Sequence, residues 1–223
     1  MRIRSKKDAE LMGLDPESLG FPGEPTRAQE RERGRKLKAN PKAKAKHKPK
    51  PPLVFRPIPI GAIVAGIDPS SSACGVAFLR QESYQSWEPQ LLGFEVIRPK
   101  MSLPVMRRID FIVDRVAELF DKYPCHVAVI EWANLARWHG GDRVGQMAPV
   151  LLAQSAVREA IRRKVFWVEE YSSNTWTGGV QKSKRAQEVR ARFPDYAACH
   201  RQGGDPGMDG ADAAGLVIWR LGR

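Results

Sequence analysis

The order of the apolar segments most restricts the folds that this chain can adopt. Three strand-like segments come first with short connections, which predicts an antiparallel meander, and helical and strand patterns then alternate. The expected strands are 60–67, 75–80, 90–97, 126–130 and 165–168. The expected helices are 103–123, 147–164, 184–193 and 210–221. This order predicts an α/β fold with a five-stranded mixed sheet and helices on both faces.

Positive charge divides the 223-residue chain into two parts. Residues 1–57 hold 16 Lys and Arg against 7 Asp and Glu, whereas residues 58–223 hold 21 against 18. A segment so rich in Lys, Pro and Ala cannot bury much apolar surface. We therefore expect 1–57 to be a basic, largely disordered extension and 58–223 to be one domain. Its clustered lysines favour an arm that binds a polyanion, and a solubilising tail or linker is the alternative.

The sequence shows no sign of membrane attachment or export. No apolar run is long enough to span a membrane, and the first residues lack the apolar stretch of a signal peptide. We expect an intracellular protein, cytoplasmic or associated with the nucleoid, with no membrane partner. The three cysteines, Cys74, Cys125 and Cys199, are odd in number and widely spaced, which argues against a disulfide framework and matches no common zinc site.

Four carboxylates have the placement expected of a metal site. Asp209 and Asp212 are three residues apart at the start of the last expected helix, so both project from one face. Asp68 and Glu131 each stand at the end of an expected strand. Like charges this close call for a cation, and carboxylates are the usual ligands of Mg²⁺. The alternatives are a turn aspartate before a proline and two ordinary helix-start acids. Weaker candidates, as ligands or as residues that orient ligands, are Asp205 and Glu170.

Three motifs carry a resemblance to a known family. They are Gly-Ile-Asp-Pro-Ser-Ser-Ser-Ala-Cys-Gly at 66–75, Val-Ile-Glu at 129–131 and Asp-Gly-Ala-Asp-Ala at 209–213. In this order they resemble the motifs of the RuvC family of Holliday-junction resolvases, as in a viral or divergent member. A looser similarity is the glycine-rich turn and lysines at 177–184. The resemblance implies a ribonuclease H-like fold over about residues 60–221 and leaves the basic extension unexplained.

The resemblance also implies a set of site residues. The acids would bind two Mg²⁺ ions, with Mn²⁺ able to substitute, and a lysine would bind a phosphate. Lys182 is preferred over Lys184 because it keeps the family's distance to Val189. The implied catalytic residues are Asp68, Glu131, Lys182, Asp209 and Asp212, the four acids being the metal ligands. The residues expected to contact nucleic acid are Ser70, Trp132, Trp138, Lys184 and Arg185.

Two positions depart from the family pattern. Asn134 stands where the family commonly has an aromatic wedge, so Trp132, Leu135 or Trp138 would have to open the junction. Trp132 and Trp138 are candidates to stack on unpaired bases, and the alternative for Trp132 is a place in the core. Ser70 stands where the family has a glycine.

These observations predict a Mg²⁺-dependent, structure-selective endodeoxyribonuclease that resolves four-way DNA junctions by two-metal phosphodiester hydrolysis. Paired cuts in a nearly symmetric junction imply a homodimer, and by resemblance the helix at 147–164 lies at its interface. The alternative for that helix is to cover the core. The alternative functions are cleavage of another nucleic acid, such as an RNA:DNA hybrid, a flap or packaging DNA, and a non-catalytic nucleic-acid-binding module of the same fold.

Overall fold

The fold is described from a computed structural model, in which residues 53–83, 88–133 and 144–223 are placed. The compact unit formed by these residues runs from Phe55 to Arg223. Most of the expected basic extension lies outside the described residues, as do Asn134, Leu135 and Trp138. None of the helices in the described ranges has the length and hydrophobicity required to cross a membrane.

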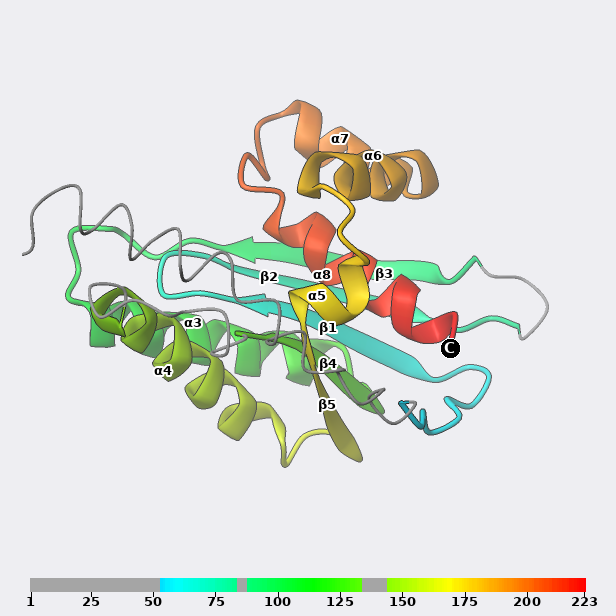
Figure 1. Cartoon of the computed structure of the whole chain (residues 1–223), viewed down its shortest axis with the longest axis horizontal. Coiled ribbons are helices and arrows are strands. Elements are labelled where there is room, and N and C mark those ends of the chain that lie inside the picture. The colour runs from blue at the N-terminus through cyan, green and yellow to red at the C-terminus, as the bar shows by residue number, and fades with distance from the viewer. Residues whose placement is uncertain (1–52, 84–87, 134–143) are drawn as a thin grey trace, which may run out of the picture. The chain divides into compact units, whose positions relative to one another are not determined.

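Five strands form one mixed sheet (Figure 1). They are β1 (Ile63–Pro69), β2 (Cys74–Arg80), β3 (Gln90–Ile97), β4 (Val127–Trp132) and β5 (Trp167–Ser172). Their order across the sheet is β3-β2-β1-β4-β5. The first three strands form the expected antiparallel meander, and β4 and β5 continue the sheet parallel to β1. The predicted five-stranded mixed sheet is therefore confirmed.

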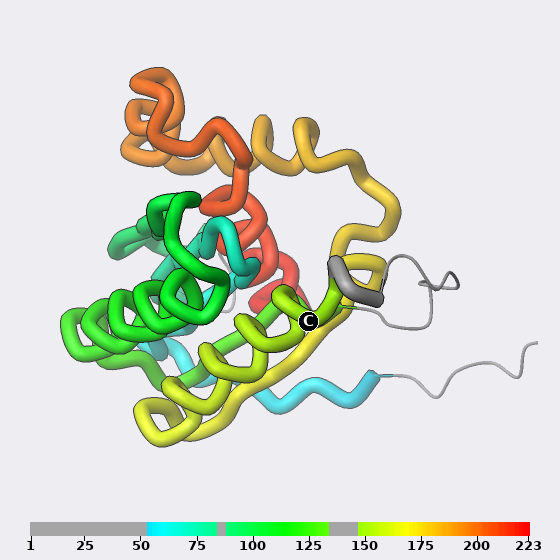
Figure 2. The backbone as a smooth tube through the Cα atoms, turned by 90° about the vertical axis from the view of Figure 1, so that its left-hand side faces the viewer, coloured from blue at the N-terminus to red at the C-terminus, as the bar shows by residue number. Residues whose placement is uncertain are grey.

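Helices cover both faces of the sheet, as predicted (Figures 1 and 2). On one face lie α3 (Val105–Lys122) and α4 (Val144–Ile161). On the other lie α5 (Ser173–Thr177), α6 (Lys182–Arg192), α7 (Pro194–Arg201) and α8 (Asp209–Leu221). The sequence did not predict α5 and α7, because helices of five and eight residues are too short to show a clear apolar period.

The alternation of side chains along the strands decides which residues face α8. Val64 and Val129 belong to the core between the sheet and α8. Asp68 comes four positions after Val64, and Glu131 comes two positions after Val129. Side chains alternate between the faces of a strand, so both acids project from the same face as the valines. Trp132 follows Glu131 and packs on the opposite face, against the core covered by α3 and α4. This position favours the core alternative for Trp132.

Two glycines allow α8 to lie directly on the sheet. A Cβ atom at Gly66 would be 2.0 Å from the backbone oxygen of Ala213, and one at Gly75 would be 2.1 Å from the backbone oxygen of Asp209. No other residue type leaves this space empty. Gly75 is the cross-strand partner of Asp68 in the β1–β2 register. The contact at Gly75 therefore brings the start of α8, where Asp209 lies, next to Asp68.

A buried ion pair holds the other end of α8. Arg220 is only 2% exposed and pairs with Glu169 of β5, and its guanidinium also donates to the backbone oxygen of Arg56. Burial acts to raise the pKa of Glu169, but the hydrogen bond and charge of Arg220 outweigh it, so the pKa is lowered and the charged carboxylate is favoured. Breaking such a pair is costly because it leaves an uncompensated buried charge. The ion pair therefore holds the C-terminal end of α8 against β5.

Candidate active site

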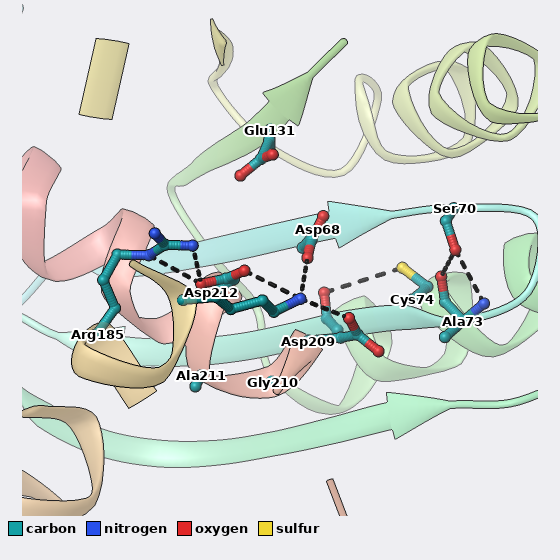
Figure 3. A network of polar contacts seen from close by, with 12 residues as sticks. Asp68, Ser70, Ala73, Cys74, Glu131, Arg185, Asp209, Gly210, Ala211 and Asp212 are labelled. Carbon is teal, nitrogen blue, oxygen red and sulfur yellow. Dashed lines mark hydrogen bonds and ion pairs between the residues drawn. The ribbon is translucent and has the colours of Figure 1, made fainter. Parts of the chain in front are cut away.

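Three aspartates gather around one lysine where α8 begins. Asp68 is the second-last residue of β1, and Asp209 and Asp212 lie in the first turn of α8. The ammonium nitrogen of Lys182 is 2.9 Å from a carboxylate oxygen of Asp209. It is 3.1 Å from an oxygen of Asp212 and 3.9 Å from an oxygen of Asp68. Figure 3 shows the three aspartates in this network. The structure thus brings together four of the five residues predicted to be catalytic.

The glycine-rich turn before α6 places Lys182. Gly178 and Gly179 have φ of 58° and 82°, a backbone conformation that glycine adopts with little strain. Lys182 then becomes the first residue of α6. Burial acts to lower the pKa of Lys182, but the nearby aspartates, Asp68 first, raise it above its usual value. The side chain is therefore a permanent cation within the acid cluster.

The acids on the sheet are costly to ionise. Burial raises the pKa of Asp68 well above its usual value, and the charge of Glu131 raises it further, while Lys182 opposes the rise. Burial also raises the pKa of Glu131. The thiol of Cys74 is buried beside them, and its pKa is raised by burial and then by Asp68. Clusters of acids with raised pKa values are found preferentially at functional sites.

Glu131, the fifth predicted residue, has a partner of its own. The indole Nε1 of Trp176 donates a hydrogen bond to Oε2 of Glu131 at 2.8 Å. Trp176 was not among the predicted site residues. The only sequence signal is its position next to the glycine-rich segment at 177–184, and that signal does not specify a contact with a strand 45 residues away.

Asp205 caps the start of α8. Its fully buried carboxylate accepts hydrogen bonds from the backbone N–H groups of Asp209, Gly210 and Ala211 at 2.9, 3.0 and 3.3 Å. The hydroxyl of Tyr196 donates to the same carboxylate at 2.7 Å. These donors use the carboxylate as a helix cap, which satisfies amides that the helix itself leaves unpaired. The structure therefore supports a positioning role for Asp205 and not the alternative of a replacement ligand.

Two arginines add positive charge around the acids. Arg185 of α6 donates two hydrogen bonds to one oxygen of Asp212, at 3.0 and 2.7 Å. Arg98, just after β3, lies 3.4 Å from an oxygen of Asp205 and 3.8 Å from an oxygen of Asp209. Arg185 was expected from the sequence, whereas Arg98 was not, because a single arginine after a strand carries no local signal.

The remaining predicted residues are distributed around this cluster. The hydroxyl of Ser70 closes the β1–β2 turn by donating to the backbone oxygen of Ala73 at 2.7 Å. Lys184 is exposed on α6. Their contacts with nucleic acid stay predictions. Glu170 pairs with Arg158 of α4, and its role as a ligand or as a residue that orients ligands stays a prediction.

The acid cluster has the carboxylate ligands of a cation site, but their oxygens are not at the distances of metal ligands. As the side chains lie, no group of three or more His, Cys, Asp or Glu among the described residues is close enough to hold a metal ion. The three aspartates instead surround an ammonium group. Their oxygens are the ligand type that Mg²⁺ prefers, and the buried negative charge requires a cation. These residues therefore fit a divalent cation.

A family match agrees with this geometry. Residues 64–187, more than half of the chain, match the family model described as crossover junction endodeoxyribonuclease RuvC. The chain belongs to the RuvC family. The RuvC match includes Asp68, Glu131 and Lys182 and ends before Asp209 and Asp212. The resemblance inferred from the sequence motifs is confirmed. A comparison with curated proteins found no match.

Solved resolvase structures share the fold. A Thermus thermophilus RuvC in complex with a Holliday junction substrate is 20% identical, with a TM-score of 0.52 over 71% of this chain and 91% of that chain. Another T. thermophilus RuvC structure is 23% identical, with a TM-score of 0.52 over 70% and 92%. The yeast mitochondrial Holliday junction resolvase Ydc2 is 16% identical, with a TM-score of 0.51 over 74% and 81%. At these identities the likeness establishes the ribonuclease H-like RuvC fold.

Proposed function

We propose that this protein is a divalent-cation-dependent endonuclease that cuts branched DNA, in particular four-way (Holliday) junctions. The observation that supports this most strongly is the convergence of three aspartates on one cation, with Glu131 on the adjacent strand, in a chain of the RuvC family. Burying several acids together costs folding free energy. A module that only binds nucleic acid would have no use for such a cluster.

Each group of residues has a separate task in this proposal. Asp68, Glu131, Asp209 and Asp212 would hold Mg²⁺ or Mn²⁺. Two such ions, when bound, would activate the attacking water and stabilise the leaving oxygen. Lys182 and Arg98 would bind phosphate oxygens beside the bond that is cut, and the raised pKa of Lys182 keeps it charged for this task. Asp205 would keep Asp209 in place through the cap on α8.

A cleavage assay tests the proposed substrate. We expect the wild-type protein with Mg²⁺ to nick a synthetic four-way junction at paired, opposed positions, and to leave a linear duplex and an RNA:DNA hybrid of the same sequence intact. The Asp212→Asn variant should bind the junction without cutting it, because Lys182 and Arg98 are unchanged. Denaturing gels report the nicks, and gel-shift titrations report binding.

The other results of this assay have definite meanings. Cleavage of the hybrid alone would support the same acid site and contradict the proposed substrate. Tight binding of the junction, with no cleavage in Mg²⁺ or Mn²⁺, would support the non-catalytic module.

We also propose that the protein acts as a homodimer with α4 at the interface. Two opposed cuts require two sites, and a two-fold dimer supplies them. Leu152 of α4 is 49% exposed and Phe111 of α3 is 48% exposed, and α3 packs against α4. These apolar side chains support an interface on this face of the sheet.

Replacing Leu152 with Glu tests the dimer. We expect light scattering to give a dimeric mass for the wild type and a monomeric mass for Leu152→Glu, because a charge would be buried at the contact. Ile60→Glu changes a residue that is 52% exposed outside the helices and should leave the dimer intact. Equal masses for the two variants would contradict an interface at α4.

A further inference from the structure

We infer that Trp176 is a positioning residue for the proposed nuclease site. It fixes the carboxylate of Glu131 and, through Arg185, links that carboxylate to Asp212. These four side chains come from β4, α5, α6 and α8, so the chain of contacts joins four elements that are separate in the sequence. The inference rests on the function proposed above, because that function makes Glu131 and Asp212 ligands.

The first contact in this chain is the hydrogen bond from Trp176 to Glu131. Only 5% of Trp176 is exposed, so its indole N–H needs a partner within the protein. The partner is Oε2 of Glu131 at 2.8 Å. The buried ring therefore determines where one oxygen of Glu131 lies.

The second contact joins the same ring to α6 and α8. The guanidinium carbon of Arg185 lies 4.8 Å from the centroid of the Trp176 ring, within the range of a cation–π interaction. The same guanidinium donates two hydrogen bonds to Oδ1 of Asp212. A change in the position of Trp176 would therefore move Arg185 as well, and with it one oxygen of Asp212.

A glycine in α8 leaves room for the indole. A Cβ atom at Gly215 would lie 3.4 Å from Cζ3 of Trp176, whereas a larger side chain there would extend into the ring. Gly215 is three residues after Asp212 and so lies on the same face of α8. The face of α8 that carries Asp212 thus also contacts Trp176, which positions Arg185, the partner of Asp212.

This arrangement would prepare the site before a cation binds. A glutamate side chain has several rotatable bonds, and ordering it on metal binding costs conformational entropy. Because Trp176 already orders Glu131, less of that cost falls on the binding step. Groups that orient metal ligands typically change metal affinity or activity by about 10–100-fold when they are removed. The expected effect of losing the indole N–H is of this size.

Replacing Trp176 with Phe tests the inference against a packing role. The variant keeps an aromatic ring beside Arg185 and removes the N–H donor. Trp167→Phe is the matched control, because the indole of Trp167 donates to Glu169 at 3.1 Å in a part of the protein away from the acid cluster. We expect calorimetric titration with Mg²⁺ to show affinity about 10–100-fold weaker for Trp176→Phe. Its kcat on the junction should fall while its KM stays close to the wild-type value.

The control variant should match the wild type in Mg²⁺ affinity and in kcat. If Trp176→Phe matched it too, the indole would serve packing only and the inference would be overturned. A wild type that neither binds Mg²⁺ nor cuts DNA would contradict the proposed function instead, so a second measurement that needs neither metal nor activity keeps the two apart.

That measurement is the NMR signal of the indole N–H of Trp176, assigned by triple-resonance experiments. We expect the signal to shift in Glu131→Gln, through the direct hydrogen bond, and in Asp212→Asn, through Arg185. The indole signal of Trp167 should stay unchanged in both variants. A Trp176 signal that responds to neither substitution would overturn the inference, whether or not Trp176→Phe folds.

Discussion

Replacing Asp68 with Asn is expected to lower junction cleavage by about 10³-fold or more and also to raise the thermal stability of the metal-free protein. Cleavage is lost because Asp68 is the acid nearest the centre of the sheet, and its amide replacement is a poor ligand for Mg²⁺. Stability rises because the carboxylate, although 20% exposed, lies in a poorly solvated place among other acids, which disfavours its charge. Most substitutions of buried polar residues destabilise a protein, so a gain would be diagnostic.

The sign of the stability effect follows from the pKa of Asp68. Burial raises this pKa well above its usual value, and Glu131 raises it further. Between the ordinary pKa of an aspartate and the raised one, the folded state holds a proton that the unfolded state has released. Stability therefore falls as the pH rises through this range. At pH values above the raised pKa, Asp68 is charged in the folded state and its full destabilising effect is present. A neutral asparagine at this position has no such effect.

Thermal unfolding at several pH values checks the effect. For a protein of this size, each kcal/mol gained raises the melting temperature by about 2–4 °C. The advantage of Asp68→Asn should be largest at neutral pH and disappear below about pH 4, near the ordinary pKa of an aspartate. Mg²⁺ should stabilise the wild type more than the variant, because the wild type binds it more tightly.

Asp110→Asn is the control for this comparison. Asp110 is an exposed acid of α3 that pairs with Arg107, and removing its charge should change neither stability nor cleavage appreciably. A metal-free Asp68→Asn protein less stable than the wild type at neutral pH would mean that Lys182 compensates the buried charge fully, contrary to the prediction.

Replacing Gly75 with Ala is the second change with a large expected effect. The new Cβ would lie 2.1 Å from the backbone oxygen of Asp209 and 2.3 Å from its carbonyl carbon, so the start of α8 must move. Overpacking of this kind costs about 1–3 kcal/mol of stability. Because Gly75 pairs with Asp68, the shift separates Asp209 from Asp68. A misplacement of about 1 Å can lower activity by about 10²-fold.

Urea unfolding and the junction assay together measure both effects of Gly75→Ala. Gly215→Ala is the control for stability, since its Cβ would meet Trp176 at 3.4 Å, an ordinary contact distance. Alanine also favours a helix over glycine by up to about 1 kcal/mol, so this variant should be at least as stable as the wild type. Equal stability of the two variants would contradict the close contact between β2 and α8.

Much of the fold was predictable because its signals are local. The apolar segments at 75–80 and 90–97 coincide with β2 and β3 almost to the residue, and the helical stripe at 103–123 contains α3. The helix expected at 184–193 corresponds to α6, which begins two residues earlier, at Lys182. What local patterns missed were α5 and α7, which are short and are each followed by a glycine-containing turn.

The acids were identifiable from the sequence because strand ends and helix starts are local features. Asp68 and Glu131 could be assigned to the ends of two strands, and Asp209 and Asp212 to one face of the last helix. The outcome for Asp205 shows the limit of that reasoning. It precedes α8 by four residues, so no capping pattern pointed to it, and its role follows from a chain path that folds the carboxylate back onto the helix start.

The amino-acid pattern alone was sufficient for the five strands, the four longer helices, the family and the choice of candidate acids, since each is marked by residues close together in the chain. Contacts between distant segments decided the rest. The hydrogen bond from Trp176 to Glu131 spans 45 residues, and the contact of Arg98 with Asp205 spans 107. Gly66 and Gly75 carry no chemistry of their own, yet they set how closely α8 approaches the sheet. The site therefore depends on packing distances, which a linear pattern does not encode.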